Sequence, residues 1–155
     1  MMPKVQILMG SKSDIEVARK AKSVLEEFGV SVDMAVASAH RTPERVESIV
    51  KECGADVFIA IAGLSAALPG VVAATTLKPV IGIPVSGKVN LDALLSVVQM
   101  PPGIPVAGVG LDRGENAGIL AVQILSISDK QLEDKMVDYR KKMAEKVIAD
   151  SEEVC

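Results

Sequence analysis

Aromatic side chains are almost absent from this sequence. Of its 155 residues, two are Phe, one is Tyr and none is Trp, although 49% of the residues are hydrophobic. The core must therefore be built from Ala, Val, Ile, Leu and Met. Such a core suits helices packed closely on a parallel sheet, whose central strands are buried on both faces. The length is typical of one domain, so we expect residues 1–155 to form a single domain.

Cysteine is also scarce. The two cysteines, Cys53 and Cys155, form no CxxC pair and lack the spacing of metal ligands. Their number and spacing argue against a disulfide framework or a zinc site. We therefore expect incidental thiols in a reduced cytoplasmic protein that holds no metal.

Long apolar segments and a basic excess are missing too. No apolar run reaches the roughly 20 residues of a membrane span, and the first ten residues lack the pattern of a secretory signal. The 17 basic residues are outnumbered by 20 acidic ones, for a formal net charge of -3. This balance argues against binding to a nucleic-acid backbone but leaves room for a local anion site. We expect a soluble cytoplasmic protein with neither membrane nor nucleic-acid partners.

What the sequence does contain is a regular alternation of short apolar runs with longer amphipathic ones. The apolar runs predict strands at Val5–Met9, Val32–Ala37, Val57–Ala62, Val80–Ile83 and Val106–Val109. The amphipathic runs predict helices at Asp14–Phe28, Thr42–Cys53, Pro69–Thr75, Leu91–Val98, Glu115–Ile127 and Lys130–Asp150. Strands that alternate with helices imply right-handed crossovers and a parallel sheet covered on both faces.

Ligands of such a sheet bind outside the carboxyl ends of its strands, so chemistry is expected in the loops that follow them. The first of these loops runs from Gly10 to Asp14 as Gly-Ser-Lys-Ser-Asp. Gly10 permits a sharp turn, and Ser11 and Ser13 stand at a helix N-terminus, which favours anions. Asp14 fits either an N-cap or a partner for sugar hydroxyls, and a plain capped turn is the alternative. The loop is not a Walker motif, so ATP is not expected.

The second loop holds His40, the only histidine of the chain, followed by Arg41, Thr42 and Pro43. Its unperturbed pKa of about 6.5 lets a histidine take and give a proton near neutral pH. Arg41 offers a planar fork for phosphate or carboxylate. Thr42 can cap the next helix, whose first position is occupied by Pro43. This placement favours an acid/base role for His40 over a structural one.

Small residues fill the third loop, Gly63–Leu68. They would let a flat ring lie against backbone N–H groups, although composition alone favours tight packing of a helix on a strand. The later segment Gln99–Pro105 has three prolines within five residues, which hold it extended and stiff. It either completes a neighbouring site or simply links a helix to a strand.

The loop motifs occur in a specific order along the chain. They read MGSKSD at 9–14, SAHRTP at 38–43, LPGVVA at 68–73, PVIG at 79–82, LLS at 94–96, QMP at 99–101 and GIPV at 103–106. From about Val5 to Leu125, this set closely resembles the N5-carboxyaminoimidazole ribonucleotide mutase family, the catalytic subunit of phosphoribosylaminoimidazole carboxylase. Each motif alone is modest, whereas the ordered set is highly specific.

The resemblance implies a three-layer α/β/α, flavodoxin-like (Rossmann-like) fold. It also implies a homo-octamer whose last helix packs on a neighbouring subunit, with no metal and no organic cofactor. The implied reaction belongs to purine biosynthesis and turns N5-carboxyaminoimidazole ribonucleotide into 4-carboxy-5-aminoimidazole ribonucleotide through trapped carbon dioxide, with His40 as general acid/base. The implied substrate-binding residues, with Arg41 on the phosphate, are Gly10, Ser11, Ser13, Asp14, Ser38, Ala39, Arg41, Gly63, Ser65, Ala66, Ala67 and Leu68.

One residue departs from the mutase pattern. The third loop of the family usually reads Ala-His-Leu-Pro-Gly, whereas Ala67 replaces the histidine here. A sister class carboxylates aminoimidazole ribonucleotide directly with carbon dioxide. It lacks that histidine and has a serine in this loop, which Ser65 partly matches. That class usually has Lys where Arg41 stands and lacks Leu-Pro-Gly. Direct carboxylation stays open beside the mutase reaction. A non-catalytic nucleotide-binding module is a third hypothesis, against which the retained Ser, Asp, His and Arg side chains argue.

Overall fold

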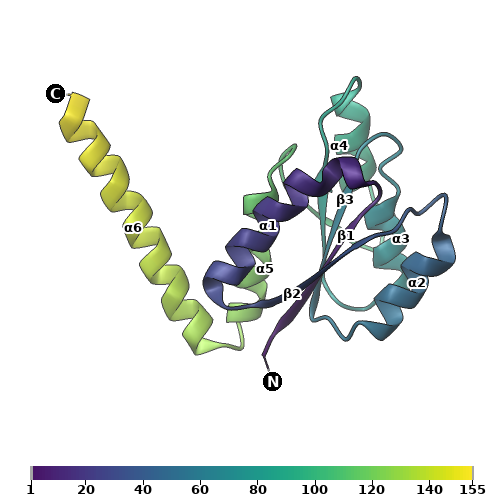
Figure 1. Cartoon of the computed structure of the whole chain (residues 1–155), viewed down its shortest axis with the longest axis horizontal. Helices are drawn as coiled ribbons and strands as arrows, with labels where there is room; N and C mark the ends of the chain where they lie inside the picture. Colours follow the sequence, from purple (N-terminus) through teal and green to yellow (C-terminus); the bar gives the residue numbers. More distant parts are fainter. Residues whose placement is uncertain (1, 155) are drawn as a thin grey trace.

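Five parallel strands form the sheet at the centre of the protein, in the order β2-β1-β3-β4-β5 (Figure 1). The computed structural model describes residues 2–154. The strands are β1 Lys4–Met9, β2 Ser31–Val36, β3 Val57–Ala62, β4 Val80–Pro84 and β5 Ala107–Gly108. The direction of sheet building reverses between β1 and β3, as in flavodoxin-like folds. The predicted parallel α/β fold is therefore confirmed.

Helices cover both faces of this sheet. They are α1 Ile15–Phe28, α2 Pro43–Glu52, α3 Leu68–Thr75, α4 Asn90–Val98, α5 Gly114–Ser126 and α6 Lys130–Val154, with a short 3-10 turn, η1, at Lys12–Asp14. One core lies between the sheet and α1, α5 and the start of α6. The other lies between the sheet and α2, α3 and α4. The result is the three-layer arrangement that the resemblance implies.

Alternation along the central strands feeds the two cores. In β1, Ile7 and Met9 belong to the core under α1 and α5, and Leu8 belongs to the core under α2 and α3. The same alternation separates Ile59 from Phe58 in β3. Successive side chains of a strand point to opposite faces, so a strand that is apolar at every position must be buried on both sides. This explains why the uninterrupted apolar run of β3 predicts a strand that is buried on both sides, whereas β1 also contains Lys4 and Gln6.

The edges of the sheet differ from the prediction. The fifth strand was predicted at Val106–Val109, but only Ala107 and Gly108 pair with β4. Pro105 has no N–H to donate to a ladder, and a Cβ at Gly108 would come within 2.8 Å of Val98 on α4. The chain therefore passes the sheet edge only briefly. The predicted bounds of β3 match the observed ones, and the remaining elements differ by at most four residues at either end.

The last helix leaves the body of the protein along most of its length (Figure 1). Leu132 and Met136 are buried, and Tyr139 packs its ring on Phe28 with centroids 5.4 Å apart. Farther along, the predicted apolar stripe is open to solvent, and Val147 is 67% exposed. Within residues 2–154, no helix combines the length and apolar character needed to cross a membrane.

Candidate active site

A cavity of about 360 Å3 opens where β1, β2 and β3 end at the carboxyl edge of the sheet. This is the point at which the strand order reverses, the usual ligand site of open α/β sheets. Three of the five predicted loops line it. The lining residues are Gly10, Ser11, Ser13, Asp14, Ser38, Ala39, His40, Arg41, Ala62, Gly63, Leu64, Ser65 and Leu68.

The loop after β1 is folded by its own hydroxyl groups. Gly10 donates its backbone N–H to the carbonyl of Ile61, 3.2 Å away, which ties the loop to the end of β3. Ser11 caps η1, because its Oγ accepts the N–H of Ser13 at 3.3 Å. Ser13 in turn donates its hydroxyl to Oδ1 of Asp14 at 3.2 Å. Ser13 thus binds the Ser11 hydroxyl through its backbone N–H and the Asp14 carboxylate through its own hydroxyl.

Asp14 is the one carboxylate of the cavity lining, and it is only 8% exposed. Burial raises the pKa of its carboxyl group above the ordinary value, and the negative charge of Asp112 adds to this effect. The hydrogen bond from Ser13 and a backbone N–H oppose the shift. Although Asp14 stands at the N-cap position of α1, its side chain makes no capping bond to the helix. The carboxylate can therefore accept hydrogen bonds from a ligand in the cavity.

Arg41 joins the first two loops. Its guanidinium donates to the Gly10 carbonyl at 2.9 Å and to Oγ of Ser38 at 3.3 Å, and Ser38 Oγ also accepts the Arg41 backbone N–H at 3.2 Å. Thr42 occupies the N-cap position of α2 but makes no side-chain cap. Its hydroxyl instead accepts the Ser38 N–H at 3.0 Å. The predicted helix start is right, whereas the predicted capping bond is replaced by a bond that shapes the loop.

His40 lies in the turn between β2 and α2, where its side chain is exposed at the mouth of the cavity. Within residues 2–154, its ring makes no hydrogen bond to another group of the chain. The imidazole is therefore free to turn toward a ligand, and its second nitrogen is open to solvent or to a neighbouring molecule.

The loop after β3 forms the far wall of the cavity. Gly63, Ser65 and Leu68 line it as predicted positions, whereas Ala66 is buried behind the lining and Ala67 is a half-buried residue at the start of α3. The lining also includes Ala62 and Leu64, which are not among the substrate-binding residues that the resemblance implies. Leu64 is 81% exposed. It is a large apolar residue between small loop residues, and this feature of the sequence could have identified it.

The loops that follow β4 and β5, at residues 86–90 and 110–116, also stand at strand ends, but they contact each other and do not line this cavity. Asp112 accepts the Ser86 N–H with its carboxylate at 2.9 Å and donates its own N–H to the Pro84 carbonyl at 3.0 Å. Its φ of 58° places it in the left-handed region, which Asp tolerates better than most residues.

Among the described residues, no three or more His, Cys, Asp or Glu side chains gather closely enough to hold a metal ion.

Comparison with known proteins agrees with this site. The AIR carboxylase family model matches residues 4–146. The N5-carboxyaminoimidazole ribonucleotide mutase of Methanocaldococcus jannaschii is 62% identical over 149 residues, which are 96% of this chain and 95% of that protein. The mutase of Pyrococcus abyssi is 53% identical over 92% of this chain and 84% of its own length.

Solved structures agree as well. The crystal structure of Treponema denticola PurE superposes with a TM-score of 0.88 at 36% identity, over 97% of this chain and 98% of that one. The variant structure PurE2-S38D from the same organism gives a TM-score of 0.90. These findings confirm the resemblance that the ordered loop motifs carry. The chain belongs to the AIR carboxylase family.

Proposed function

We propose that this enzyme converts N5-carboxyaminoimidazole ribonucleotide to 4-carboxy-5-aminoimidazole ribonucleotide in purine biosynthesis. The observation that carries the proposal is the cavity at the strand-order reversal, whose lining combines one histidine, one arginine and the Asp14 carboxylate. The family match over residues 4–146 and relatives named for this reaction support it.

The chemistry of the lining divides the substrate into parts. Ser11, Ser13 and Asp14 suit the hydroxyls of a ribose, because they supply both donors and a buried acceptor. Arg41 suits the phosphate, and Ser38 holds the guanidinium in place. The small residues after β3 leave space for the flat imidazole ring, with Gly63 and Leu68 in the wall. Ala39, Ser65, Ala66 and Ala67 complete the proposed binding region.

The proposed reaction is an isomerisation that conserves all atoms. The bond between the exocyclic nitrogen and its carboxylate breaks, which releases carbon dioxide within the cavity, and that nitrogen receives a proton. Carbon 4 of the ring then attacks the carbon dioxide, and the proton on this carbon leaves to restore aromaticity. His40 moves the proton, because histidine is the residue type in this lining that most often serves as a general acid and base. Holding both reactants in place supplies the rate advantage.

The exposure of the site supports an assembly of several subunits. His40 is exposed and Leu64 is 81% exposed, so the isolated chain leaves its cavity open to water. Carbon dioxide would escape from such a site before it is captured. We therefore infer that a neighbouring subunit completes each site. The family resemblance implies that the assembly is a homo-octamer in which α6 packs on another subunit, and we propose that the enzyme works in the cytoplasm.

A second candidate function is the direct carboxylation of aminoimidazole ribonucleotide by carbon dioxide. It is favoured by Ser65 in the cavity lining and by Ala67 where the mutase pattern has a histidine. The two reactions use the same ring carbon and the same proton shuttle, and they differ in the source of carbon dioxide. Spectrophotometric assays with the N-carboxylated substrate in one cuvette, and with aminoimidazole ribonucleotide and bicarbonate but no ATP in the other, separate them. Conversion in the first cuvette alone identifies the mutase, and conversion in the second at modest bicarbonate identifies the carboxylase.

Replacing the proton shuttle tests the mechanism. In His40→Asn, we expect turnover to fall at least about 100-fold, which is the usual contribution of general acid/base catalysis. Affinity for aminoimidazole ribonucleotide, measured by calorimetry, should stay nearly unchanged because the exposed ring makes no hydrogen bond to the rest of the described chain. Strong residual turnover in this variant would rule out the acid/base role of His40.

A further inference from the structure

Leu64 differs from every other residue that lines the active-site cavity. Two large apolar side chains belong to the lining, and Leu68 is 2% exposed whereas Leu64 is 81% exposed. The other lining residues are small or polar. A single exposed leucine on a protein surface is common and needs no explanation. A leucine that stands in water at the mouth of a polar ligand cavity is a different case, because a bound ligand can cover it.

The backbone of this loop is held on both sides of Leu64 and is free between them. On one side, the Ala62 carbonyl accepts the N–H of Val85 at 3.1 Å. On the other side, the Ser65 carbonyl accepts the N–H of Ala67 at 2.8 Å. Within residues 2–154, residues 63 and 64 make no backbone hydrogen bond of their own. Segments with few hydrogen bonds move at little cost, so Leu64 can change direction without disturbing β3 or α3.

The proposed reaction needs an apolar cover at this place. Carbon dioxide carries no net charge, so the arginine and the hydroxyl groups of the lining cannot hold it as they would hold an anion. It stays beside the ring only while the cavity is closed to water. The neighbours of Leu64, Gly63 and Ser65, are too small to reach across a ring. Leu64 is therefore the residue of this loop that can provide the cover.

We propose that Leu64 is a lid residue, which folds over the imidazole ring of the bound ribonucleotide and holds the released carbon dioxide against carbon 4. The inference rests on the proposed function and gives a positioning role to a residue that lies outside the loop motifs. With the lid closed, carbon 4 bonds to the carbon dioxide and then loses its proton. With the lid open, the carbon dioxide leaves and the protonated nitrogen remains, which gives aminoimidazole ribonucleotide.

An isotopic label in the carboxylate measures the closure of the lid. The labelled N-carboxylated substrate is converted in unlabelled bicarbonate, and mass spectrometry gives the labelled fraction of the product, with an enzyme-free sample as correction. Leu64→Ala should release carbon dioxide at least about threefold more often per product molecule than wild type, because its cavity stays open. Leu64→Met keeps an apolar side chain of similar volume and should retain the label as wild type does.

Leu77→Ala is the matched control, because Leu77 is a fully exposed leucine that does not line this cavity. It should keep the labelled fraction of wild type, and both alanine variants should sediment as wild type does. A wild-type labelled fraction in Leu64→Ala would overturn the lid. Loss of label together with dissociation of the assembly would also overturn it, because Leu64 would then be a contact between subunits.

Tryptophan fluorescence separates this inference from the proposed reaction, since the chain has no tryptophan of its own. In Leu64→Trp, aminoimidazole ribonucleotide should move the emission to shorter wavelength as the indole leaves water, whereas ribose 5-phosphate, which lacks the ring, should not. Leu77→Trp should respond to neither ligand. A shift without conversion of the N-carboxylated substrate would refute the proposed reaction alone. No shift, with binding of aminoimidazole ribonucleotide shown by calorimetry, would overturn the lid alone.

Discussion

At the residue scale, the candidate site carries one feature that works against stability. Asp14 is 8% exposed, and burial raises the pKa of its carboxyl group. A buried carboxylate whose pKa is raised favours the native state only when it is protonated. Its ionised form at neutral pH is therefore a cost to folding, which is consistent with a residue kept for ligand binding rather than for packing.

Asp14→Asn should stabilise the protein at pH 7. The amide removes the charge and can still accept the Ser13 hydroxyl, so we expect a gain of about 0.5–2 kcal/mol in the free energy of unfolding. In wild type, the native state binds more protons than the unfolded state between the ordinary and the raised pKa, so its stability falls as pH rises through that window. The advantage of Asp14→Asn should shrink as pH falls and Asp14 becomes protonated.

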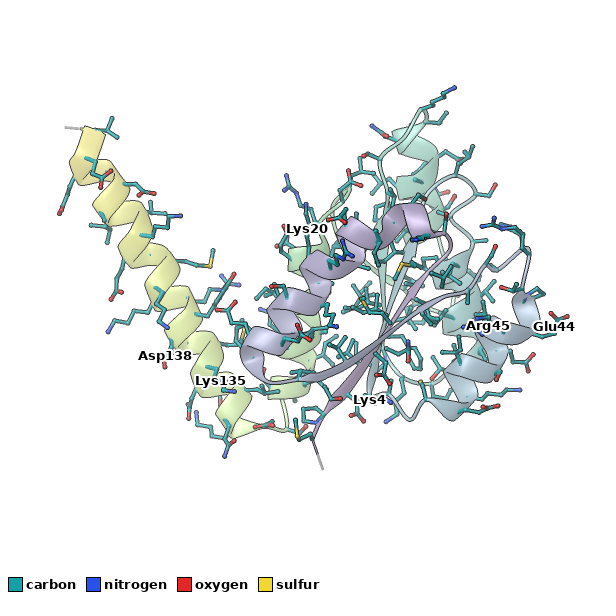
Figure 2. All side chains as sticks on the ribbon, viewed as in Figure 1. Lys4, Lys20, Glu44, Arg45, Lys135 and Asp138 are labelled. Carbon is teal, nitrogen blue, oxygen red and sulfur yellow. The ribbon has the colours of Figure 1, made fainter. Side chains whose placement is uncertain are left out.

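Denaturant unfolding of both proteins from about pH 4 to pH 7 measures this difference. Asp138→Asn is the control, because Asp138 is an exposed carboxylate on α6 (Figure 2) and should give no comparable gain. An Asp14→Asn variant that is less stable than wild type at every pH would contradict the prediction.

The residues of the site were predictable from the sequence to different degrees. Gly10 directly follows β1 and His40 lies in the loop that follows β2, so the rule that ligands bind at strand ends selects both without a structure. The bond from Arg41 to the Gly10 carbonyl joins residues 31 positions apart, and no local pattern encodes it. Leu64 and Ala66 are two positions apart in the chain, yet Ala66 is buried and Leu64 lines the cavity. The turn before α3 sets the directions of these two side chains.

At the element scale, the closest packing is between α1 and α5. Two glycines at the start of α5 allow it. A Cβ at Gly114 would lie 2.9 Å from Cβ of Lys20 and closer still to the Val17 carbonyl. A Cβ at Gly118 would lie 2.9 Å from the Ala21 carbonyl. Backbone atoms of one helix therefore rest on backbone atoms of the other.

Gly114→Ala should push these two helices apart. Because the obstructing atoms include backbone of α1, they cannot move as a side chain would, and we expect a loss of about 2–4 kcal/mol in the free energy of unfolding. Gly87→Ala is the control, since a Cβ there meets nothing within 4 Å. Chemical denaturation of both variants measures the loss, and equal stability of the two would refute this account of the packing.

Elements were predicted well where their burial is uniform and less well where it is not. Every residue of β3 is buried, so its apolar run gave the correct bounds of Val57–Ala62. In β5 the two paired residues are exposed. The predicted strand was too long, because an edge strand pairs with one neighbouring strand only, here β4, and burial does not mark its ends. The predicted end of α6 falls four residues short of Val154. The last turns are exposed along the described part of the chain, so no buried face sets an apolar pattern there.

At the scale of the whole molecule, α6 is the element that the single chain leaves unexplained. Its first turns pack on the body through Leu132 and Met136, and its later turns project into solvent (Figure 1). Met143, Val147 and Ile148 are each more than half exposed there. A run of exposed apolar side chains on one helix is typical of an interface between subunits.

Met143→Lys combined with Val147→Lys should break the proposed assembly. These side chains are exposed, so the variant chain should keep the helical content of wild type by circular dichroism. In sedimentation velocity, wild type should be far larger than the 16.2 kDa chain, and the double variant should sediment as smaller species because charges are costly in an apolar interface. Turnover should fall together with assembly size, since the open cavity around His40 then lacks its neighbour.

Glu145→Lys is the matched control for this experiment. Glu145 lies on the opposite side of α6 from Met143 and Val147, and its replacement by Lys also adds positive charge. It should assemble and turn over as wild type does. A wild-type monomer would refute the shared site outright. A double variant that dissociates while keeping full turnover would show instead that each chain closes its own cavity, and the trapping of carbon dioxide would then have to come from the loop around Leu64 alone.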